Sequence, residues 1–182
     1  NALTWAFYLL SQNPAAEAKL HAELTQELAG RTPTIDDLPR LAYTKMVIEE
    51  TLRLYPPAWG VGRQSIAADN VGGYTIPANA SLTLPFYVMH RDPRWWDDPE
   101  RFEPERFTPE RSAKRHKFAY LPFGAGPRQC IGNNFAMMEA QLLLATVAQR
   151  YRLRLVPGHR VEPNPIFVLR TSDGLPMMLE RR

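Results

Sequence analysis

Proline constrains this chain more than any other residue, because 17 of its 182 residues are prolines. That share of about 9% is roughly twice the usual one. A proline has no backbone N–H and interrupts helices and central strands, so the sequence predicts short elements joined by many turns rather than a simple helical bundle. With 45% hydrophobic and 23% charged residues, the composition is that of a globular protein. It excludes a disordered chain, a collagen-like fibre and a disulfide scaffold.

Helical segments dominate the first third of the chain. An apolar helix runs to Asn13-Pro14, and a second helix over residues 15–28 is rich in Ala, Glu, Leu and Lys. Thr34, followed by Asp37, resembles the capping box that starts a helix. This box predicts a third helix that ends at about Tyr55, where a pair of prolines follows.

Short strands and irregular segments are expected in the rest of the chain. The predicted strands are 61–67, 74–76, 81–84 and 151–156, with 166–169 and 176–179 as a closing pair. Residues 86–122 show no clear period, but their aromatic side chains are expected to pack. A long helix over residues 131–151 carries Phe135, Met138 and Leu142 on one stripe. The expected fold class is α+β, mainly α with small β-sheets, in one partial domain over residues 1–182.

The chain starts inside an apolar helix at Asn1, with neither an initiator methionine nor a capping pattern before it. We therefore expect the 182 residues to be the C-terminal part of a longer domain. No stretch reaches the roughly 18 uncharged apolar residues that a membrane span needs. A cytoplasmic location is expected for this part, while the sequence leaves open a membrane anchor upstream.

The single cysteine, Cys130, cannot form an internal disulfide, so it is either a small buried hydrophobe or a reactive or ligating thiol. It stands at the start of the predicted long helix, where the helix dipole and free N–H groups favour a thiolate. Gly124 and Gly126 allow the backbone to approach a flat group closely, and Gly132 leaves room beside the helix. Arg128 supplies a fixed cation for a carboxylate. A haem needs a thiolate, a loop that allows close approach and a cation for a carboxylate. The alternative interpretation is that Cys130 is a buried free cysteine beside a glycine turn.

Residues 123–132 read Phe-Gly-Ala-Gly-Pro-Arg-Gln-Cys-Ile-Gly and fill every fixed position of the signature F-x-x-G-x-R-x-C-x-G. This segment resembles the cysteine-ligand loop of the cytochrome P450 family. The resemblance implies a P450-like fold of which this chain is the C-terminal part. It also implies that Cys130 is the axial thiolate ligand of the iron of haem b, which is iron protoporphyrin IX.

The resemblance assigns further residues to the cofactor site. The implied cofactor-binding residues are Phe123, Gly124, Gly126, Arg128, Cys130, Gly132 and Arg63. Phe123 would shield the sulfur, and Arg128 and Arg63 would pair with the haem propionates. For Arg63 the alternative is a solvent-facing strand residue.

Two further segments resemble the same family in the expected order. Glu50 and Arg53 stand three residues apart on one helical face, and Arg106 lies in a Pro-Glu-Arg-Phe segment. The resemblance implies that these three residues form a buried structural triad behind the haem, with no catalytic role. For the first two residues the alternative is an ordinary surface ion pair on a helix.

Two segments match the family's substrate pocket, although their residues could equally belong to the core. They are Ala58, Trp59, Gly60 and Val61 in the first segment, and Ile166, Phe167 and Val168 in the second. His90 is expected to be a structural hydrogen-bonding residue rather than a ligand. No His/Cys cluster has zinc spacing, and no phosphate loop occurs in the sequence.

Basic residues gather shortly before the cysteine loop, although the net charge of the chain is only +3. They are Arg111, Lys114, Arg115 and Lys117. Most such runs are solvated faces. The resemblance implies an electron-donor protein or fused reductase (a ferredoxin or a flavoprotein) on this side, steered by complementary charge. Nucleic-acid binding is disfavoured because no recognition module accompanies the charge.

The resemblance implies a haem-thiolate monooxygenase. In the full-length parent it would activate O₂ to hydroxylate or epoxidise an apolar organic substrate. The family's acid–alcohol pair would lie upstream of Asn1, so no catalytic residue beyond the ligand Cys130 is expected, and the chain alone is expected to be inactive. A peroxide-using peroxygenase of the same family and a non-enzymatic haem-binding protein are the alternatives.

Overall fold

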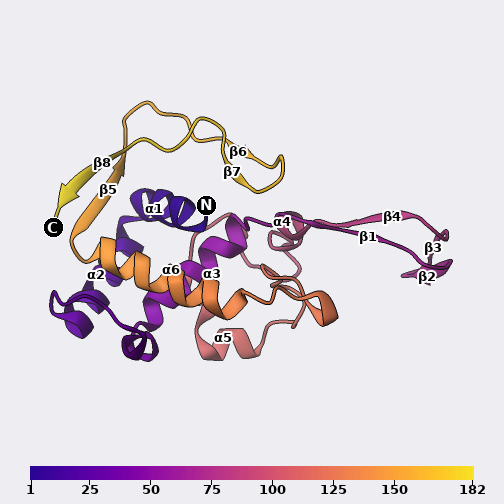
Figure 1. The fold of residues 1–182 in the computed structure, drawn as a ribbon, viewed down its shortest axis with the longest axis horizontal. Coiled ribbons are helices and arrows are strands. Elements are labelled where there is room, and N and C mark those ends of the chain that lie inside the picture. The colour runs from indigo at the N-terminus through magenta and orange to yellow at the C-terminus, as the bar shows by residue number, and fades with distance from the viewer.

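A computed structural model describes residues 1–182. Its α-helices are α1 (Ala2–Gln12), α2 (Pro14–Leu28), α3 (Ala42–Leu54), α4 (Phe86–Met89), α5 (Pro109–Ala113) and α6 (Asn133–Ala148). The 3₁₀ helices are η1 (Ile35–Arg40), η2 (Pro104–Phe107) and η3 (Gly126–Arg128). Helices α1, α2, α3 and α6 form the body of the molecule (Figure 1).

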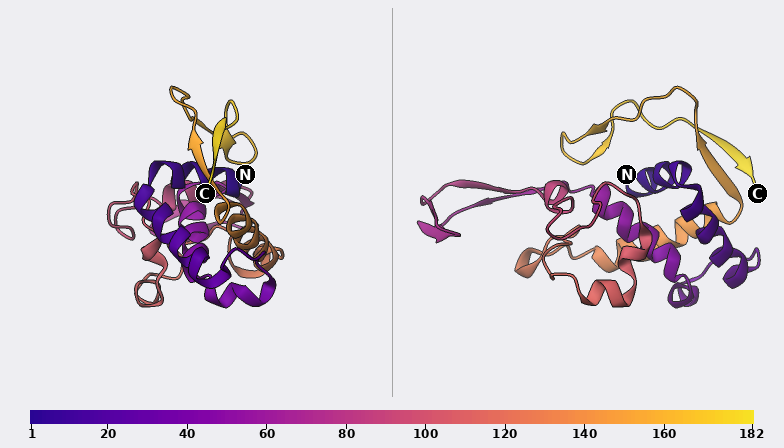
Figure 2. Two further views of the ribbon diagram at one scale, coloured as in Figure 1. Left: turned by 90° about the vertical axis from the view of Figure 1, so that its left-hand side faces the viewer. Right: turned by 180° about the vertical axis from the view of Figure 1, so that it is seen from behind.

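The strands form four separate two-stranded antiparallel sheets. These pairs are β1 (Val61–Gln64) with β4 (Ser81–Leu84), β2 (Asp69–Val71) with β3 (Tyr74–Ile76), β5 (Tyr151–Leu155) with β8 (Met177–Arg181), and β6 (Pro163–Asn164) with β7 (Arg170–Thr171). The β1–β4 ribbon extends away from the helices with β2–β3 at its far end, whereas the C-terminal sheets lie over α1 (Figures 1 and 2). The mainly α fold class with small sheets is therefore confirmed.

A core of 16 buried apolar residues lies among α1, α2, α3 and α6. Helix α2 contributes Leu20, Leu24 and Leu28, which recur at every fourth position on one face. Ile48 of α3 and Leu144 of α6 are also fully buried in this core. The core therefore holds α3, which carries Glu50, against α6, which follows Cys130.

The predicted single helix over residues 34–55 is wrong, because the structure divides it into η1 and α3. Thr34 and Asp37 do form the expected capping box, but the box starts a 3₁₀ helix. Pro39 lies inside η1 and has no N–H to donate, and the backbone leaves the helical conformation at Leu41.

A side chain from another helix caps the N-terminus of α3. The carboxylate of Glu23, on α2, accepts hydrogen bonds from the backbone N–H groups of Tyr43 and Thr44 in the first turn of α3. It also accepts one from the Thr44 hydroxyl at 2.7 Å. These N–H groups have no partner within their own helix, so Glu23 caps α3 and ties it to α2.

Two strand predictions also need correction. The strand predicted over 61–67 ends at Gln64, and residues 69–71 form a separate strand that a glycine turn joins to β3. Residues 166–169 form no strand, and the C-terminal strand β8 pairs with β5 instead. Residues 166–168 bend, and the Leu169 N–H donates to the Pro57 carbonyl at 2.9 Å instead of to a neighbouring strand.

The predicted stripe on the long helix is not its buried face. Helix α6 buries Gln141, Leu144, Ala145 and Ala148 instead, and Phe135 is 63% exposed. Of the predicted stripe, Phe135 is therefore exposed, and Met138 and Leu142 are only half-buried.

The proline-rich segment 86–122 packs through its aromatic side chains, as expected, though not through all of them. Trp96 and Phe107 are buried in a small cluster with Ala119, whereas Trp95 and Phe118 are each 49% exposed. None of the helices combines the length and the apolar character that crossing a membrane requires.

Candidate functional site

The cysteine lies in a tight loop between Leu121 and α6. Gly124 and Gly126 have φ angles of 71° and 70°, in the left-handed region that favours glycine. The Cys130 N–H donates to the Phe123 carbonyl at 2.9 Å and closes the loop. The loop therefore presents an exposed thiol close to the start of a helix.

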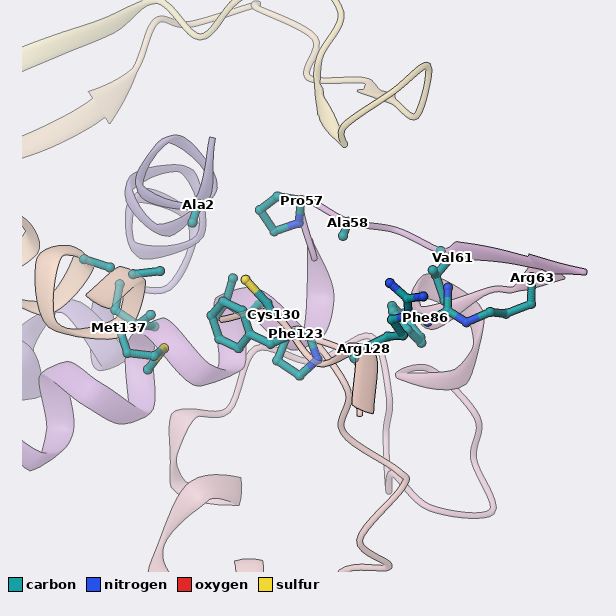
Figure 3. A pocket seen from close by; sticks show the side chains of 17 residues that line it. Ala2, Pro57, Ala58, Val61, Arg63, Phe86, Phe123, Arg128, Cys130 and Met137 are labelled. Carbon is teal, nitrogen blue, oxygen red and sulfur yellow. The ribbon is translucent and has the colours of Figure 1, made fainter. Parts of the chain in front are cut away.

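Cys130 forms part of the wall of a cavity of about 350 Å³ (Figure 3). Eleven of its 17 lining residues are hydrophobic, and they come from segments far apart in the chain. Helix α1 contributes Ala2, α3 contributes Ile48, the segment before β1 contributes Ala58, and α6 contributes Ala140. Such a space suits a flat apolar group that the sulfur can reach.

Two arginines stand on one side of this apolar cavity. Arg63 extends from β1 and Arg128 from η3, and their guanidinium groups reach towards one another in Figure 3. Neither forms an ion pair with a carboxylate of the chain. The only side-chain hydrogen bond of Arg63 goes to the neighbouring Gly62 carbonyl at 2.8 Å. Two unpaired cations beside an apolar space are suited to a ligand with an apolar body and carboxylates.

The start of α6 gives room beside the sulfur. Gly132, Ala136 and Ala140 follow one another at four-residue intervals, which places them on one face of the helix. A Cβ atom at position 132 would lie 3.8 Å from the Cys130 sulfur. A larger side chain there would therefore fill space beside the thiol. The donor set and the cavity thus fit a thiolate-ligated haem.

The sequence model of the cytochrome P450 family matches residues 1–177. The chain belongs to the cytochrome P450 family. Its relatives include the cyclooctatin synthase of Streptomyces melanosporofaciens, which is 46% identical over 100% of this chain and 39% of the relative. The cyclooctat-9-en-7-ol 5-monooxygenase of the same organism is 43% identical over 86% of this chain and 34% of its own length.

The structural comparison agrees with the family match. The crystal structure of a cytochrome P450, CYP102L1, superposes on the whole chain with a TM-score of 0.90 at 32% sequence identity, and the match covers 42% of that protein. The chain therefore spans about two-fifths of the length of the P450 proteins that it resembles.

The structure brings together the three residues predicted to form the P450 triad. The Arg53 guanidinium makes two hydrogen bonds to the Glu50 carboxylate, at 2.7 and 2.8 Å, and both side chains are fully buried. The Nε atom of Arg106 lies 3.4 Å from Glu50 Oε1. Burial raises the pKa of Glu50, and the hydrogen bonds from Arg53 oppose that rise.

Arg53 also connects the triad to the irregular segment that precedes the cysteine loop. It donates hydrogen bonds to the carbonyls of His90, Pro99 and Arg101, at 2.9, 2.7 and 3.1 Å. One buried guanidinium therefore satisfies a carboxylate and three backbone carbonyls.

Most of the residues predicted to contact the cofactor line the cavity. Those that line it are Phe123, Gly124, Arg128, Cys130 and Arg63. Gly126 and Gly132 do not line it. Gly126 lies in the turn of the cysteine loop with a positive φ angle, and Gly132 lies beside the Cys130 sulfur.

The predicted substrate-pocket residues divide into two groups. Ala58, Gly60 and Val61 line the cavity, whereas Trp59 does not. Residues 166–168 lie outside it, and Phe167 is 90% exposed. Their proposed contact with substrate stays a prediction.

Sequence reasoning did not single out nine of the lining residues as part of the site. They are Ala2, Ile48, Leu52, Pro57, Phe86, Pro122, Ala136, Met137 and Ala140. The four-residue spacing of small side chains after Cys130 would have pointed to Ala136 and Ala140. The others carry no local signal, because only the fold places them near the sulfur.

The basic run before the cysteine loop is only partly a solvated face. Arg111 pairs with Glu103 at 2.6 Å. The Arg115 guanidinium lies 4.4 Å from the ring centroid of Trp96 and 4.6 Å from that of Phe107, and burial lowers its pKa. Lys114 and Lys117 are exposed and form no ion pair, and the Lys117 ammonium lies 4.8 Å from the ring centroid of Phe118.

Proposed function

We propose that this chain is the haem-binding part of a haem-thiolate monooxygenase, with haem b as the cofactor and Cys130 as the iron ligand. The observation that carries this proposal is the exposed Cys130 thiol at the wall of an apolar cavity with two unpaired arginines on one side. Haem b has a flat apolar ring and two carboxylates, and these features match that cavity. Membership of the cytochrome P450 family supports the same assignment.

Each residue of the site has a separate task in this proposal. Cys130 holds the iron through its thiolate, and Phe123 covers the approach to the sulfur. Arg63 and Arg128 orient the haem through its carboxylates and limit its rotation in the cavity. The bound haem supplies O₂ chemistry, and a thiolate ligand favours cleavage of the O–O bond.

The proposed reaction inserts one oxygen atom of O₂ into an apolar organic substrate, while two electrons from the donor protein and two protons reduce the other oxygen atom to water. The apolar lining from Ala58, Val61 and Phe86 favours such a substrate. One relative is named a 5-monooxygenase of cyclooctat-9-en-7-ol, which supports oxygen insertion as the reaction class. We assign this activity to a protein of the relatives' length, and we expect no coupled turnover from residues 1–182 alone.

The electron donor is proposed to be an acidic ferredoxin or flavoprotein, either separate or fused. Lys114 and Lys117 are the free cations that would steer it to the cysteine side. Because such steering is electrostatic, the rate of reduction should fall as ionic strength rises.

The test is the absorption spectrum of the haem-loaded protein after reduction and addition of carbon monoxide. A thiolate ligand moves the main band far to the red of that of a histidine-ligated haem, and the Cys130→Ser variant should lose this shift. A wild-type spectrum without the shift would refute the proposal. In a protein of the relatives' length, a thiolate spectrum without substrate oxidation, in the presence of an electron donor, would indicate a haem-binding protein that is not an enzyme.

A further inference from the structure

The buried residue His90 connects the triad to the cysteine loop. Its side chain is completely buried, and both ring nitrogens have a backbone partner. Nδ1 lies 3.2 Å from the carbonyl oxygen of Arg53, and Nε2 lies 2.8 Å from the backbone nitrogen of Leu121. Arg53 lies on α3, and Leu121 is the first residue of the cysteine loop.

These partners determine the protonation state of the imidazole. A carbonyl oxygen only accepts a hydrogen bond, so Nδ1 must carry the proton. A backbone N–H only donates, so Nε2 must be the unprotonated nitrogen that accepts from Leu121. His90 is therefore neutral with its proton on Nδ1, and a second proton at Nε2 would face the Leu121 N–H directly.

The contact with Arg53 is reciprocal. The Arg53 side chain donates to the His90 carbonyl at 2.9 Å, while the His90 ring donates to the Arg53 carbonyl. This pair of bonds fixes the imidazole to the residue that also holds Glu50. The position of His90 is therefore determined by a guanidinium group that is itself fully buried.

From Leu121 the connection continues to the thiol through two backbone hydrogen bonds. The Leu121 carbonyl accepts from the Gly124 N–H at 3.1 Å, and the Phe123 carbonyl accepts from the Cys130 N–H at 2.9 Å. A shift of Leu121 would therefore be transmitted to Phe123 and then to Cys130.

We propose that His90 is a positioning residue for Cys130, because its neutral imidazole anchors the start of the cysteine loop to the buried Glu50–Arg53 pair. This inference rests on the proposed haem-thiolate function. His90 itself touches neither the cavity nor the thiol, so its effect on the ligand passes through Leu121.

The surroundings of the ring keep it neutral at physiological pH. The charged and titratable groups that face it are Arg53 on α3, Arg91 beside it in the chain, and Tyr120 in the preceding loop segment. Burial and the two nearby guanidinium groups lower the pKa of His90 to about 4. Acid should therefore loosen the Leu121 contact only well below neutral pH.

Two variants test the two hydrogen bonds of the His90 ring independently. In His90→Gln the amide oxygen can occupy the place of Nε2 and still accept from Leu121. In His90→Asn the shorter amide can take the place of Nδ1 and donate to the Arg53 carbonyl, but it cannot reach Leu121. We expect the backbone amide of Leu121 to exchange with solvent about tenfold faster in His90→Asn and close to the wild-type rate in His90→Gln.

The haem-loaded variants give the second readout. His90→Asn should lose the red-shifted carbon monoxide band of the thiolate more readily on mild acidification or warming, and His90→Gln should retain it. Equal behaviour of the two variants, in exchange and in spectrum, would overturn the proposal and leave His90 as a packing residue. If the wild type shows no thiolate band, the proposed function fails, whereas the exchange comparison still tests the anchor.

The wild-type protein provides a test that needs no folded variant. The Leu169 amide is a suitable reference, because its partner is the Pro57 carbonyl, which does not titrate at these pH values. The ratio of the Leu121 to the Leu169 exchange rate should rise as the pH falls towards about 4, the pKa of His90. A ratio that stays constant over this range would contradict the assigned role.

Discussion

Arg63 and Arg128 show how single residues give the cavity its chemical character. They come from two short elements far apart in the chain, yet both guanidinium groups reach the same side of an otherwise apolar space (Figure 3). The sequence motif pointed firmly to Arg128, because that arginine stands two residues before the cysteine. Arg63 was assigned only through the resemblance, and the β1–β4 pairing holds the strand that carries it.

Replacing either arginine by glutamine should lower haem affinity about tenfold, because one charge-assisted hydrogen bond to a carboxylate is lost. Titration of the haem-free protein with haem, followed by absorption, measures this change. Lys114→Gln removes an equivalent charge outside the cavity and should leave the affinity unchanged. Equal affinities for Arg63→Gln, Arg128→Gln and Lys114→Gln would show that the carboxylates are bound elsewhere.

His21 should make the fold sensitive to acid. Its side chain is 5% exposed, and burial together with Arg182 lowers its pKa from 6.5 to about 4. The unfolded chain therefore takes up a proton before the folded chain does, so stability falls as the pH drops from 6.5 towards 4. The loss attributable to His21 between neutral pH and pH 5 is about 2 kcal/mol.

Urea unfolding at several pH values measures this dependence. The His21→Gln variant should lose part of the acid sensitivity, whereas the exposed residue His116 gives a control variant, His116→Gln, that should keep it. An unchanged pH profile in His21→Gln would mean that another group causes the acid sensitivity.

At the scale of whole elements, helix α3 shows where sequence patterns reach their limit. The capping box at Thr34 was correctly predicted from four consecutive residues, because both of its partners are local. The start of α3 depends instead on Glu23, which lies about 20 residues earlier on another helix. A local pattern cannot contain such a contact, so the two elements were predicted as one.

Glu23→Ala should therefore destabilise the protein by about 0.5–2 kcal/mol, which is the usual range for loss of a helix cap. Urea unfolding at neutral pH gives the value. Glu139→Ala is the matched control, because Glu139 is an exposed glutamate within α6 with no ion pair. If both variants have the same free energy of unfolding, Glu23 does not act as the cap of α3.

At the scale of the whole molecule, the Glu50–Arg53–Arg106 cluster joins α3, η2 and the segment before the cysteine loop. The motifs allowed these three residues to be predicted as a group, and the structure places them together. The sequence could not reveal how many backbone carbonyls Arg53 satisfies. Nor could it show the cavity as a whole, since Ala2 and Ala140 meet there only after the chain has folded.

Glu50→Ala should cost about 3–5 kcal/mol of stability, because it leaves two guanidinium groups buried without their carboxylate. Glu100→Ala breaks the ion pair with Arg91, in which the glutamate side chain is 71% exposed, and it should cost under about 1 kcal/mol. Thermal and urea unfolding of both variants provide the comparison. Similar losses from the two would contradict a structural role for the buried cluster.

The backbone conformation at two glycines of the cysteine loop restricts the chirality of any residue that replaces them. No heavy atom lies within 4 Å of where a Cβ would stand at Gly124 or Gly126, so space does not exclude a side chain there. Their positive φ angles disfavour any L-residue other than glycine, because such a residue is strained by about 1–2 kcal/mol in this region. A D-alanine prefers this same backbone region, so it would avoid the strain that an L-alanine incurs and would also restrict the unfolded chain. The loop that presents the thiol therefore discriminates between the two mirror forms of a residue at these positions.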